Sequence, residues 1–256
     1  MVNLVSVIIT AHNYGKFLKK CISSVLEQTY NNIEIIVVND GSKDNTIEIL
    51  KTFANKIKII NLPGVGLAKA SNIGIRHSTG KYVIRLDADD WFDKNIIKIL
   101  VNYLIKNTKV GMVFCDFFHV DVEGKILLME KRMKITSKHT LLDRPCLAAG
   151  AMFRRECYNA VGGYNEKYRF QEDYDFWIKF REKFLIRNIN TPLMYYRKHS
   201  NSMSTNYFEK TRVRQKVKRD FIKKFREKKL TIGVIPARSD YVNNENYLLF
   251  KINGKT

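Results

Sequence analysis

The sequence predicts an α/β domain with a mostly parallel, Rossmann-like central sheet and flanking helices. Two observations support this fold class. Strand-like and helix-like segments alternate through the first half of the chain, as in parallel strands joined by right-handed crossover helices. The segment 33–40, IEIIVVND, is a nearly continuous apolar run, as expected of a strand that helices cover on both faces. With 45% hydrophobic residues, the 256-residue chain can fill a large core.

Each element of the first half follows from its residue pattern. Runs rich in valine and isoleucine predict strands, and apolar residues three or four positions apart predict helices. The expected strands, in chain order, cover residues 5–10, 33–40, 57–60 and 81–87. The expected helices cover residues 16–28, 42–54, 66–78 and 95–106.

The second half departs from this regular alternation. Its expected elements are a long strand over 110–121, a hairpin turn at 123–125, a strand, short helix and Gly-Gly break over 150–166, a helix over 171–183, and a strand over 192–204 that ends in a polar loop. The helix over 171–183 has Phe176, Trp177 and Phe180 as its apolar stripe. Because no repeat and no Pro-, Gly- or Ser-rich linker precedes residue 205, residues 1–204 are expected to form one domain.

A basic segment follows over 205–229. Its residues Val213, Val217, Phe221 and Phe225 lie four apart, with lysine and arginine at the other positions, which predicts a basic amphipathic helix. Two alternatives stay open for this helix. It packs on its own domain with a solvated outer face, or it contacts an anionic membrane or polymer.

The net charge and the cysteine content limit the kinds of binding partner and the cellular compartment that are expected. The formal net charge of +20 indicates an anionic partner, namely nucleic acid, an acidic membrane surface or a phosphate-bearing substrate, unless the lysines form only a solvated surface. The four cysteines are scattered, which argues against a disulfide framework or a zinc site. No signal-like or membrane-spanning stretch is found, so a cytoplasmic protein is expected, with peripheral contact at the inner face of the plasma membrane as one option.

Polar residues stand where three expected strands end. Thr10 and His12 follow the first strand, Asp40 ends the second, and Asp87 and Asp89 follow KYVIRL. In doubly wound sheets ligands bind at the carboxyl ends of the strands, so neighbouring strands would line one crevice with these groups. Clustered carboxylates suit Mg²⁺ or Mn²⁺, which prefer oxygen ligands.

Local structural roles are the alternatives for these carboxylates. Asp40 could shape the NDGS turn, and Asp90 is expected to cap the helix that follows it. An isolated D-x-D motif is common by chance, so its position directly after an apolar strand is what favours a metal site.

At this point a resemblance becomes specific. VSVIITAHNYG, VVNDGSKDNT, GLAKASNIGIRHSTGKYVIRLDADD, GGYNEKYRFQEDYDFWIKF and YYRKHSNSMS occur in an order that resembles glycosyltransferase family 2, over residues of about 3–204. The resemblance implies the GT-A fold and inverting transfer of a sugar from a nucleoside diphosphate sugar, UDP-linked by expectation, to a glycan or lipid-linked acceptor.

The resemblance also implies roles for individual donor-site residues. Asp40 matches the aspartate that contacts the nucleotide base, and Thr10 and His12 lie in the first nucleotide-contacting loop. Asp87 and Asp89 match the D-x-D motif, whose first member reaches the ribose and whose last ligates Mn²⁺ or Mg²⁺ on the diphosphate.

Two further roles concern the reaction and the metal. Asp173, in QED, matches the catalytic base, with Glu172 beside it, and His199 matches a histidine that helps to hold metal or diphosphate. The chain departs from the family at ASN (70–72), where Ser71 replaces a frequent arginine. That departure puts donor contacts at this position in doubt.

Competing functions follow from the same residues. Ser71 and the tail support a non-catalytic nucleotide-sugar or glycan-binding scaffold. The tail over 230–256 resembles the truncated opening of a cytidylyltransferase, a possible remnant of a second domain from which no nucleotidyl transfer is expected. Nucleic-acid binding rests on charge alone, and since no known nucleic-acid module is found, no nucleic-acid partner is expected.

Overall fold

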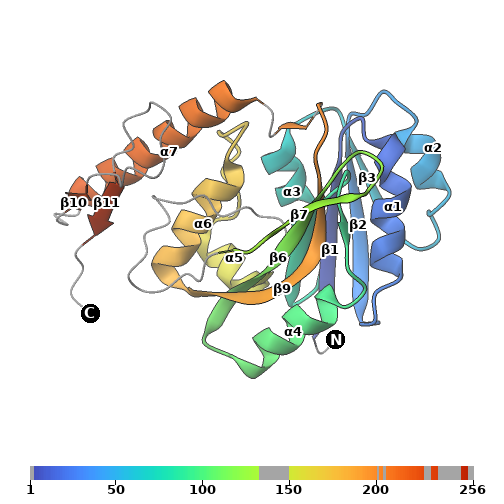
Figure 1. Ribbon diagram of the computed structural model, residues 1–256, viewed down its shortest axis with the longest axis horizontal. Coiled ribbons are helices and arrows are strands. Elements are labelled where there is room, and N and C mark those ends of the chain that lie inside the picture. The colour runs from blue at the N-terminus through green and yellow to red at the C-terminus, as the bar shows by residue number, and fades with distance from the viewer. Residues whose placement is uncertain are drawn as a thin grey trace.

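The computed structural model describes residues 3–132, 150–200, 202–203, 206–227, 232–235 and 249–252 (Figure 1). A curled, mostly parallel sheet with helices on both faces forms its body, which confirms the predicted fold class. The strands of this sheet are β1 (Val5–Ala11), β2 (Ile33–Asp40), β3 (Lys58–Leu62), β4 (Tyr82–Asp87), β5 (Trp91–Phe92), β6 (Val110–Val120), β7 (Ile126–Glu130), β8 (Ala151–Arg154) and β9 (Leu185–Arg197).

The strand order is β3-β2-β1-β4-β8-β6-β9-β5, with β7 paired to β6. The neighbours β3, β2, β1 and β4 run parallel, so their carboxyl ends meet at one edge of the sheet. The short strand β8 lies antiparallel between β4 and β6, and β9 runs parallel to β6. Two further strands, β10 (Ile232–Ile235) and β11 (Leu249–Ile252), pair with each other in a separate two-stranded sheet.

The helices cover both faces of the sheet and enclose two apolar cores. They are α1 (Gly15–Leu26), α2 (Thr46–Lys51), α3 (Leu67–Arg76), α4 (Ile96–Lys106), α5 (Arg155–Val161), α6 (Glu172–Lys183) and α7 (Tyr207–Glu227). Alternate residues of β1 point to opposite faces: Ile9 packs in the core beneath α1 and α4, and Ile8 packs in the core beneath α3, α5 and α6. Because both faces of the sheet are apolar, the parallel strands are held between the helix layers, and the strand ends are held in fixed positions.

Most predicted elements are confirmed, with differences at particular boundaries. The helix expected over 42–54 is limited to α2, where the carboxylate of Asp44 accepts hydrogen bonds from the backbone nitrogens of Thr46 and Gly15. The turn at 123–125 is confirmed, since β6 and β7 form a hairpin around it. The strand expected to begin at residue 192 is β9, and it begins at Leu185 instead, because its polar first half pairs with β6.

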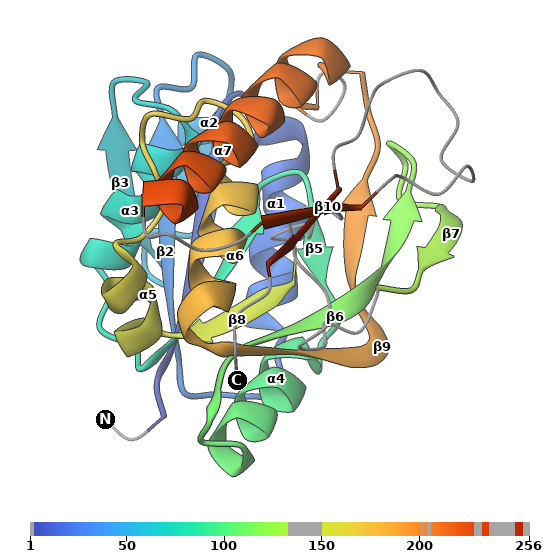
Figure 2. The same cartoon turned by 90° about the vertical axis from the view of Figure 1, so that its left-hand side faces the viewer.

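The basic helix α7 lies across the α6 side of the molecule (Figure 2). Val217 is buried in the core that α5 and α6 share, and Val213 and Phe221 pack against that core. Of the two alternatives for this helix, packing on its own domain is therefore the one found for its inner face. The side chain of Phe225 lies outside the described residues.

Two other expectations concern the tail and the membrane. Most of 230–256, including the stretch 236–248 on which the cytidylyltransferase resemblance depends, lies outside the described residues. Within the residues that the structure describes, no helix combines the length and the apolar character needed to cross a bilayer. Cys21, Cys115 and Cys157 are buried free thiols.

Candidate active site

Side chains from three strand ends meet at one edge of the sheet. Thr10 of β1 lies opposite Asp87 of β4 in the parallel register, and its hydroxyl donates to Asp87 Oδ1 over 3.2 Å. His12 Nδ1 donates to the main-chain oxygen of Asp40 over 2.6 Å, which places the imidazole proton on Nδ1. The structure thus brings together the four residues expected to contact the nucleotide, and their contact with a nucleotide stays a prediction.

Asp40 anchors a loop rather than its own turn. Its two carboxylate oxygens accept hydrogen bonds from the backbone nitrogens of Val65, at 2.6 Å, and Gly66, at 2.8 Å, just before α3. The NDGS turn is instead held by Asn39, whose side-chain oxygen accepts from the nitrogen of Ser42. A turn-shaping role for Asp40 is therefore wrong, because its carboxylate bonds to a different loop.

The two D-x-D carboxylates have different surroundings. Asp87 has a side chain that is 33% exposed and lies 3.4 Å from the guanidinium of Arg85. Asp89 is buried, and its Oδ2 lies 2.9 Å from Nε2 of His199. Burial and the negative charge of Asp87 raise the pKa of Asp89, and the hydrogen bond from His199 opposes that shift. Asp87 can therefore face a ligand directly, whereas Asp89 acts together with His199.

Asp90 does not cap the following helix, and that prediction is wrong. Its Oδ1 accepts from the backbone nitrogen of Arg197 over 2.8 Å, and Asn95, not Asp90, is the residue before α4. Its other oxygen is buried and has no hydrogen-bond partner among the described residues. Burial, together with the carboxylates of Asp89 and Asp87, raises the pKa of Asp90 well above its ordinary value. Asp90 thus joins the end of β9 to the D-x-D turn.

The end of β9 brings His199 to the D-x-D turn. Arg197 donates from Nε to the main-chain oxygen of Asp89 over 2.9 Å. Its guanidinium lies 4.5 Å from the ring centre of Phe17 and 4.7 Å from that of Trp91. The ring of His199 packs edge-on against Tyr14, with the centroids 5.5 Å apart. These contacts fix the imidazole beside Asp89.

The donor atoms of Asp89 and His199 fit a divalent cation bound jointly with a substrate. Across the described part of the chain, no three His, Cys, Asp or Glu side chains gather in a metal-binding group. Mg²⁺ and Mn²⁺ are commonly held by one or two carboxylates, with substrate phosphates and water completing the shell. Asp89 supplies one such carboxylate, and the imidazole of His199 in contact with it adds a nitrogen donor.

Asp173 lies in the first turn of α6 and is half-buried. Its Oδ1 accepts from the backbone nitrogen of Tyr174 over 2.7 Å. Gln171, two residues earlier, has a left-handed backbone with φ of 60°, which is uncommon for a residue with a side chain, and Arg214 of α7 donates to its side-chain oxygen over 2.8 Å. Such strained conformations cluster at functional sites, so the turn before Asp173 supports its candidacy.

Arg85 connects the two halves of the site, and the sequence pattern did not predict this role. Its NH1 donates to Glu172 Oε1 over 3.0 Å, and its Nε lies 3.4 Å from Asp87. Both Arg85 and Glu172 are buried. Burial and the neighbouring carboxylate of Asp173 raise the pKa of Glu172 to about 7, although Arg85 acts in the other direction. The available signal was an isolated arginine inside the otherwise apolar strand YVIRL.

Ser71 is fully buried on α3, and its hydroxyl has no hydrogen-bond partner among the described residues. The next residue, Asn72, donates from its amide to the main-chain oxygen of Tyr164 and to Glu166, both over 2.9 Å. Asn72 therefore holds the loop that leads to α6, and the serine before it is enclosed in the interior.

Comparison with known proteins places this arrangement in a family. The model of the glycosyl transferase family 2 matches residues 6–162. An uncharacterized glycosyltransferase of Haemophilus influenzae is 32% identical over 237 residues, which cover 86% of this chain and 73% of that protein. A hyaluronan synthase of Pasteurella multocida is 28% identical over 192 residues, or 74% of this chain and 20% of that protein. The chain thus spans only about a fifth of the synthase.

Solved structures share the fold. TarS of S. aureus in complex with UDP-GlcNAc superposes with a TM-score of 0.67 at 20% identity, over 80% of this chain and 61% of that one. The mannosyltransferase PcManGT of Pyrobaculum calidifontis, in complex with GDP-Man and Mn²⁺, gives a TM-score of 0.59 at 19% identity, over 82% of this chain and 60% of that one. At these identities the likeness establishes the GT-A fold.

Proposed function

We propose that this chain, which belongs to glycosyl transferase family 2, transfers a sugar from a nucleoside diphosphate sugar to a hydroxyl group of a glycan or lipid-linked acceptor. The observation that carries the proposal is the pair of ion contacts made by Arg85, to Asp87 at the strand edge and to Glu172 beside Asp173. Through them the candidate donor residues and the candidate base form one connected cluster, which a single transfer step requires.

The donor is bound at the carboxyl ends of β1, β2 and β4. Thr10, His12 and Asp40 contact the nucleoside, and Asp87 contacts its ribose. We favour a UDP-sugar, in line with the UDP-GlcNAc bound to TarS, and PcManGT with GDP-Man makes a guanine nucleotide the alternative to test. The transferred group in this proposal is a hexosyl or N-acetylhexosaminyl unit.

Asp89 and His199 hold the divalent cation, Mn²⁺ or Mg²⁺. When bound, the cation neutralises negative charge that develops on the departing diphosphate. The support is the contact between a buried carboxylate and an imidazole at the strand edge, together with the Mn²⁺ in the PcManGT complex. Arg197 keeps the backbone of Asp89 in place, so that the two ligands stay together.

Asp173 is the general base. The acceptor oxygen attacks the anomeric carbon of the donor sugar from the side opposite the diphosphate, and its proton passes to the Asp173 carboxylate. The bond from the anomeric carbon to the diphosphate oxygen breaks, and its electron pair leaves with the nucleoside diphosphate. One attack of this kind inverts the anomeric configuration, with no sugar bound covalently to the protein.

The biological setting is part of the proposal. Residues 1–204 carry the transferase reaction, and the product belongs to a surface polysaccharide or related glycan, as the synthase names among the relatives suggest. We place the protein in the cytoplasm, with peripheral contact at the inner face of the plasma membrane.

A donor-turnover assay tests the proposal. The purified chain is incubated with UDP-glucose, UDP-GlcNAc, UDP-glucuronic acid or GDP-mannose, with Mn²⁺ or with a chelator, and released nucleoside diphosphate is measured with and without acceptor glycans. We expect slow release from at least one donor with Mn²⁺ and little with the chelator. Binding of a donor without any release, with every acceptor tried, would favour the non-catalytic scaffold that buried Ser71 suggests.

A further inference from the structure

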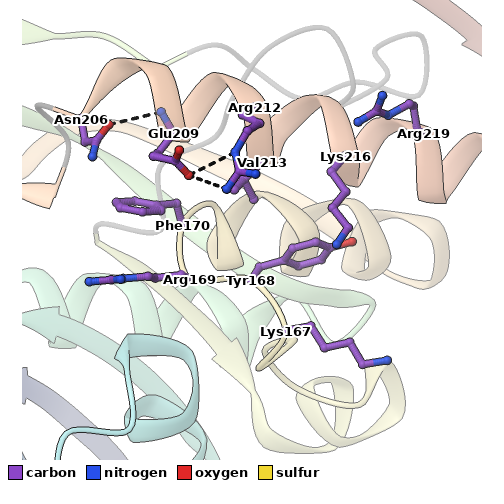
Figure 3. A pocket seen from close by; sticks show the side chains of 10 residues that line it. All are labelled: Lys167, Tyr168, Arg169, Phe170, Asn206, Glu209, Arg212, Val213, Lys216 and Arg219. Atoms are coloured by element: carbon purple, nitrogen blue, oxygen red, sulfur yellow. Dashed lines mark hydrogen bonds and ion pairs between the residues drawn. The ribbon is translucent and has the colours of Figure 1, made fainter.

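A basic pocket lies between α7 and the loop that leads to α6 (Figure 3). Its volume is about 450 Å³, within the range of small-molecule and sugar sites. The loop contributes Lys167 and Arg169, and α7 contributes Arg212, Lys216 and Arg219. The pocket thus gathers cations from two segments that are separate in the sequence.

The positive charge of the pocket is mostly uncompensated. Glu209 is the single carboxylate among the lining residues, and it pairs with Arg212 over 2.7 Å, as the dashed lines of Figure 3 mark. Lys167, Arg169, Lys216 and Arg219 make no ion pair with any described residue. Four cations around one concavity repel each other, so a bound anion would stabilise the arrangement.

The walls of the pocket are held by buried contacts. Tyr168 is buried, and its hydroxyl donates to Asp220 of α7 over 2.9 Å. Val217 sits in the core on the inner face of the same helix. The loop and the helix are therefore joined, and the backbone positions that carry the cations are held on either side of the pocket.

The pocket adjoins the candidate base. The loop over 167–170 continues directly into Gln171, to which Arg214 of α7 donates, and then into Asp173. Burial and the charge of Arg214 lower the pKa of Lys210, and the carboxylate of Asp173 opposes that shift, so the start of α7 is within electrostatic reach of Asp173. An acceptor with one group bound in the pocket would therefore have its reacting hydroxyl group near Asp173.

We propose that this basic pocket binds an anionic group, a phosphate or a carboxylate, carried by the acceptor glycan. The inference rests on the proposed function, because it assigns the pocket to the acceptor side of the same site. The donor is assigned to the edge of the sheet at Asp87 and Asp89, and neither residue is among those that line the pocket. An acidic membrane surface is the competing ligand, and the concave form of the pocket favours a group that can enter it.

Binding measurements with defined probes test the inference. The full chain is titrated calorimetrically with oligogalacturonate and its carboxyl-reduced neutral form, and with a phosphorylated mannan oligosaccharide and its dephosphorylated form. The neutralised variant is Lys167→Gln/Arg169→Gln/Lys216→Gln. A second variant keeps the charges, Lys167→Arg/Arg169→Lys/Lys216→Arg, and a third removes three exposed lysines elsewhere, Lys51→Gln/Lys56→Gln/Lys98→Gln.

We expect the natural chain to bind at least one acidic probe about tenfold more tightly than its neutral form, because several cations line the pocket that the anion would enter. The neutralised variant loses this preference, while the charge-keeping and remote variants retain it. The inference is overturned if the natural chain prefers neither acidic probe, if the neutralised variant keeps the preference, or if the remote variant loses it equally.

Two further measurements distinguish the acceptor pocket from a membrane-binding surface and from the donor site. Co-sedimentation with phosphatidylglycerol vesicles identifies a membrane surface: loss of vesicle binding in the neutralised variant, without preference for either acidic probe, overturns the acceptor assignment. Thermal shift with UDP-sugars and Mn²⁺ is measured on the natural chain and on the neutralised variant, and equal shifts assign the nucleotide to the donor site, because a diphosphate held in the basic pocket would stabilise only the natural chain. If the chain binds none of the UDP-sugars yet prefers an acidic glycan, the proposed function is contradicted. The pocket then remains assigned as a binding site for an acidic glycan.

Discussion

Arg85 in β4 and Glu172 at the start of α6 form a buried ion pair, with 3.0 Å between NH1 and Oε1. The pair joins the end of β4, on the side proposed to bind the donor, to the turn that carries Asp173. Removing Arg85 would leave the carboxylate of Glu172 buried without its cation, which commonly costs about 3–5 kcal/mol of stability, whereas Arg85 without Glu172 still lies 3.4 Å from Asp87. The pair is therefore a link between the two halves of the site and a point of sensitivity to pH.

The variant Glu172→Gln should change the pH dependence of stability. The folded-state pKa of Glu172 is raised to about 7 from 4.5, so its stabilising contribution is complete below pH 4.5 and is lost as the pH rises to about 7. A glutamine side chain at this position cannot lose a proton, so between about pH 5 and 8 the stability of the variant should rise by about 2 kcal/mol relative to that of the natural chain. Urea unfolding across this range measures the difference, and a difference that does not change with pH contradicts the assignment.

The variant Asp173→Asn should abolish transfer and spare donor binding. A general base contributes roughly 10²–10⁴ in rate, so we expect transfer to fall about a thousandfold, with the donor Kd changed by less than about twofold. Single-turnover product formation and donor titration measure the two effects. The exposed Glu182→Gln on the same helix serves as the control, and normal turnover by Asp173→Asn would remove Asp173 as the base.

The variant His199→Gln should weaken the metal dependence of donor binding. His199 contacts Asp89 over 2.9 Å and contributes the nitrogen ligand in the proposed cation site, so we expect the Mn²⁺ concentration for half-maximal UDP binding to rise about tenfold. The exposed His77→Gln is the matched control and should leave that concentration unchanged. Equal Mn²⁺ requirements for His199→Gln and the natural chain would exclude His199 as a ligand.

Two glycines with a left-handed backbone should respond differently to alanine. Gly41 has φ of 71°, and a Cβ there would lie 2.7 Å from the backbone nitrogen of Gly64. Gly162, directly after α5, has φ of 78° and ψ of 22°, but a Cβ there would meet no atom within 4 Å. Both variants carry the left-handed strain of about 1–2 kcal/mol, and Gly41→Ala adds a steric clash with backbone. Thermal unfolding should therefore rank Gly41→Ala as clearly less stable than Gly162→Ala, and equal stability of the two variants would show that the loop at Gly64 moves aside without cost.

The sequence could predict the elements whose signal is local. The apolar run of β2 and the stripe of Phe176, Trp177 and Phe180 predict a buried strand and a buried helix face, and both are found. The first half of β9 and the two-residue β5 were not predicted, because they are polar or very short and exist through pairing with partner strands. Such pairing depends on distant residues and leaves no periodic pattern.

The candidate site likewise has residues that the sequence could predict and contacts that it could not. The residues at the strand ends could be identified because they follow apolar runs directly. The contact of Asp89 with His199 joins positions 110 apart in the chain, and only the family resemblance pointed to it. The bridging role of Arg85 had no local signal beyond its charge, since its two partners come from different elements. The uncompensated cations of the basic pocket also depend on how α7 packs.

The late position of β9 has a consequence for how the chain is made. Thr10, Asp40 and Asp87 leave the ribosome early, whereas His199 follows the end of β9, the last strand of the main sheet. A nascent chain that had reached only the end of the family-matched region, 6–162, would hold the residues proposed to contact the nucleoside but neither Asp173 nor His199. Under the proposed function, synthesis must therefore pass α6 and β9 before the polypeptide carries both the proposed base and the proposed nitrogen ligand of the metal.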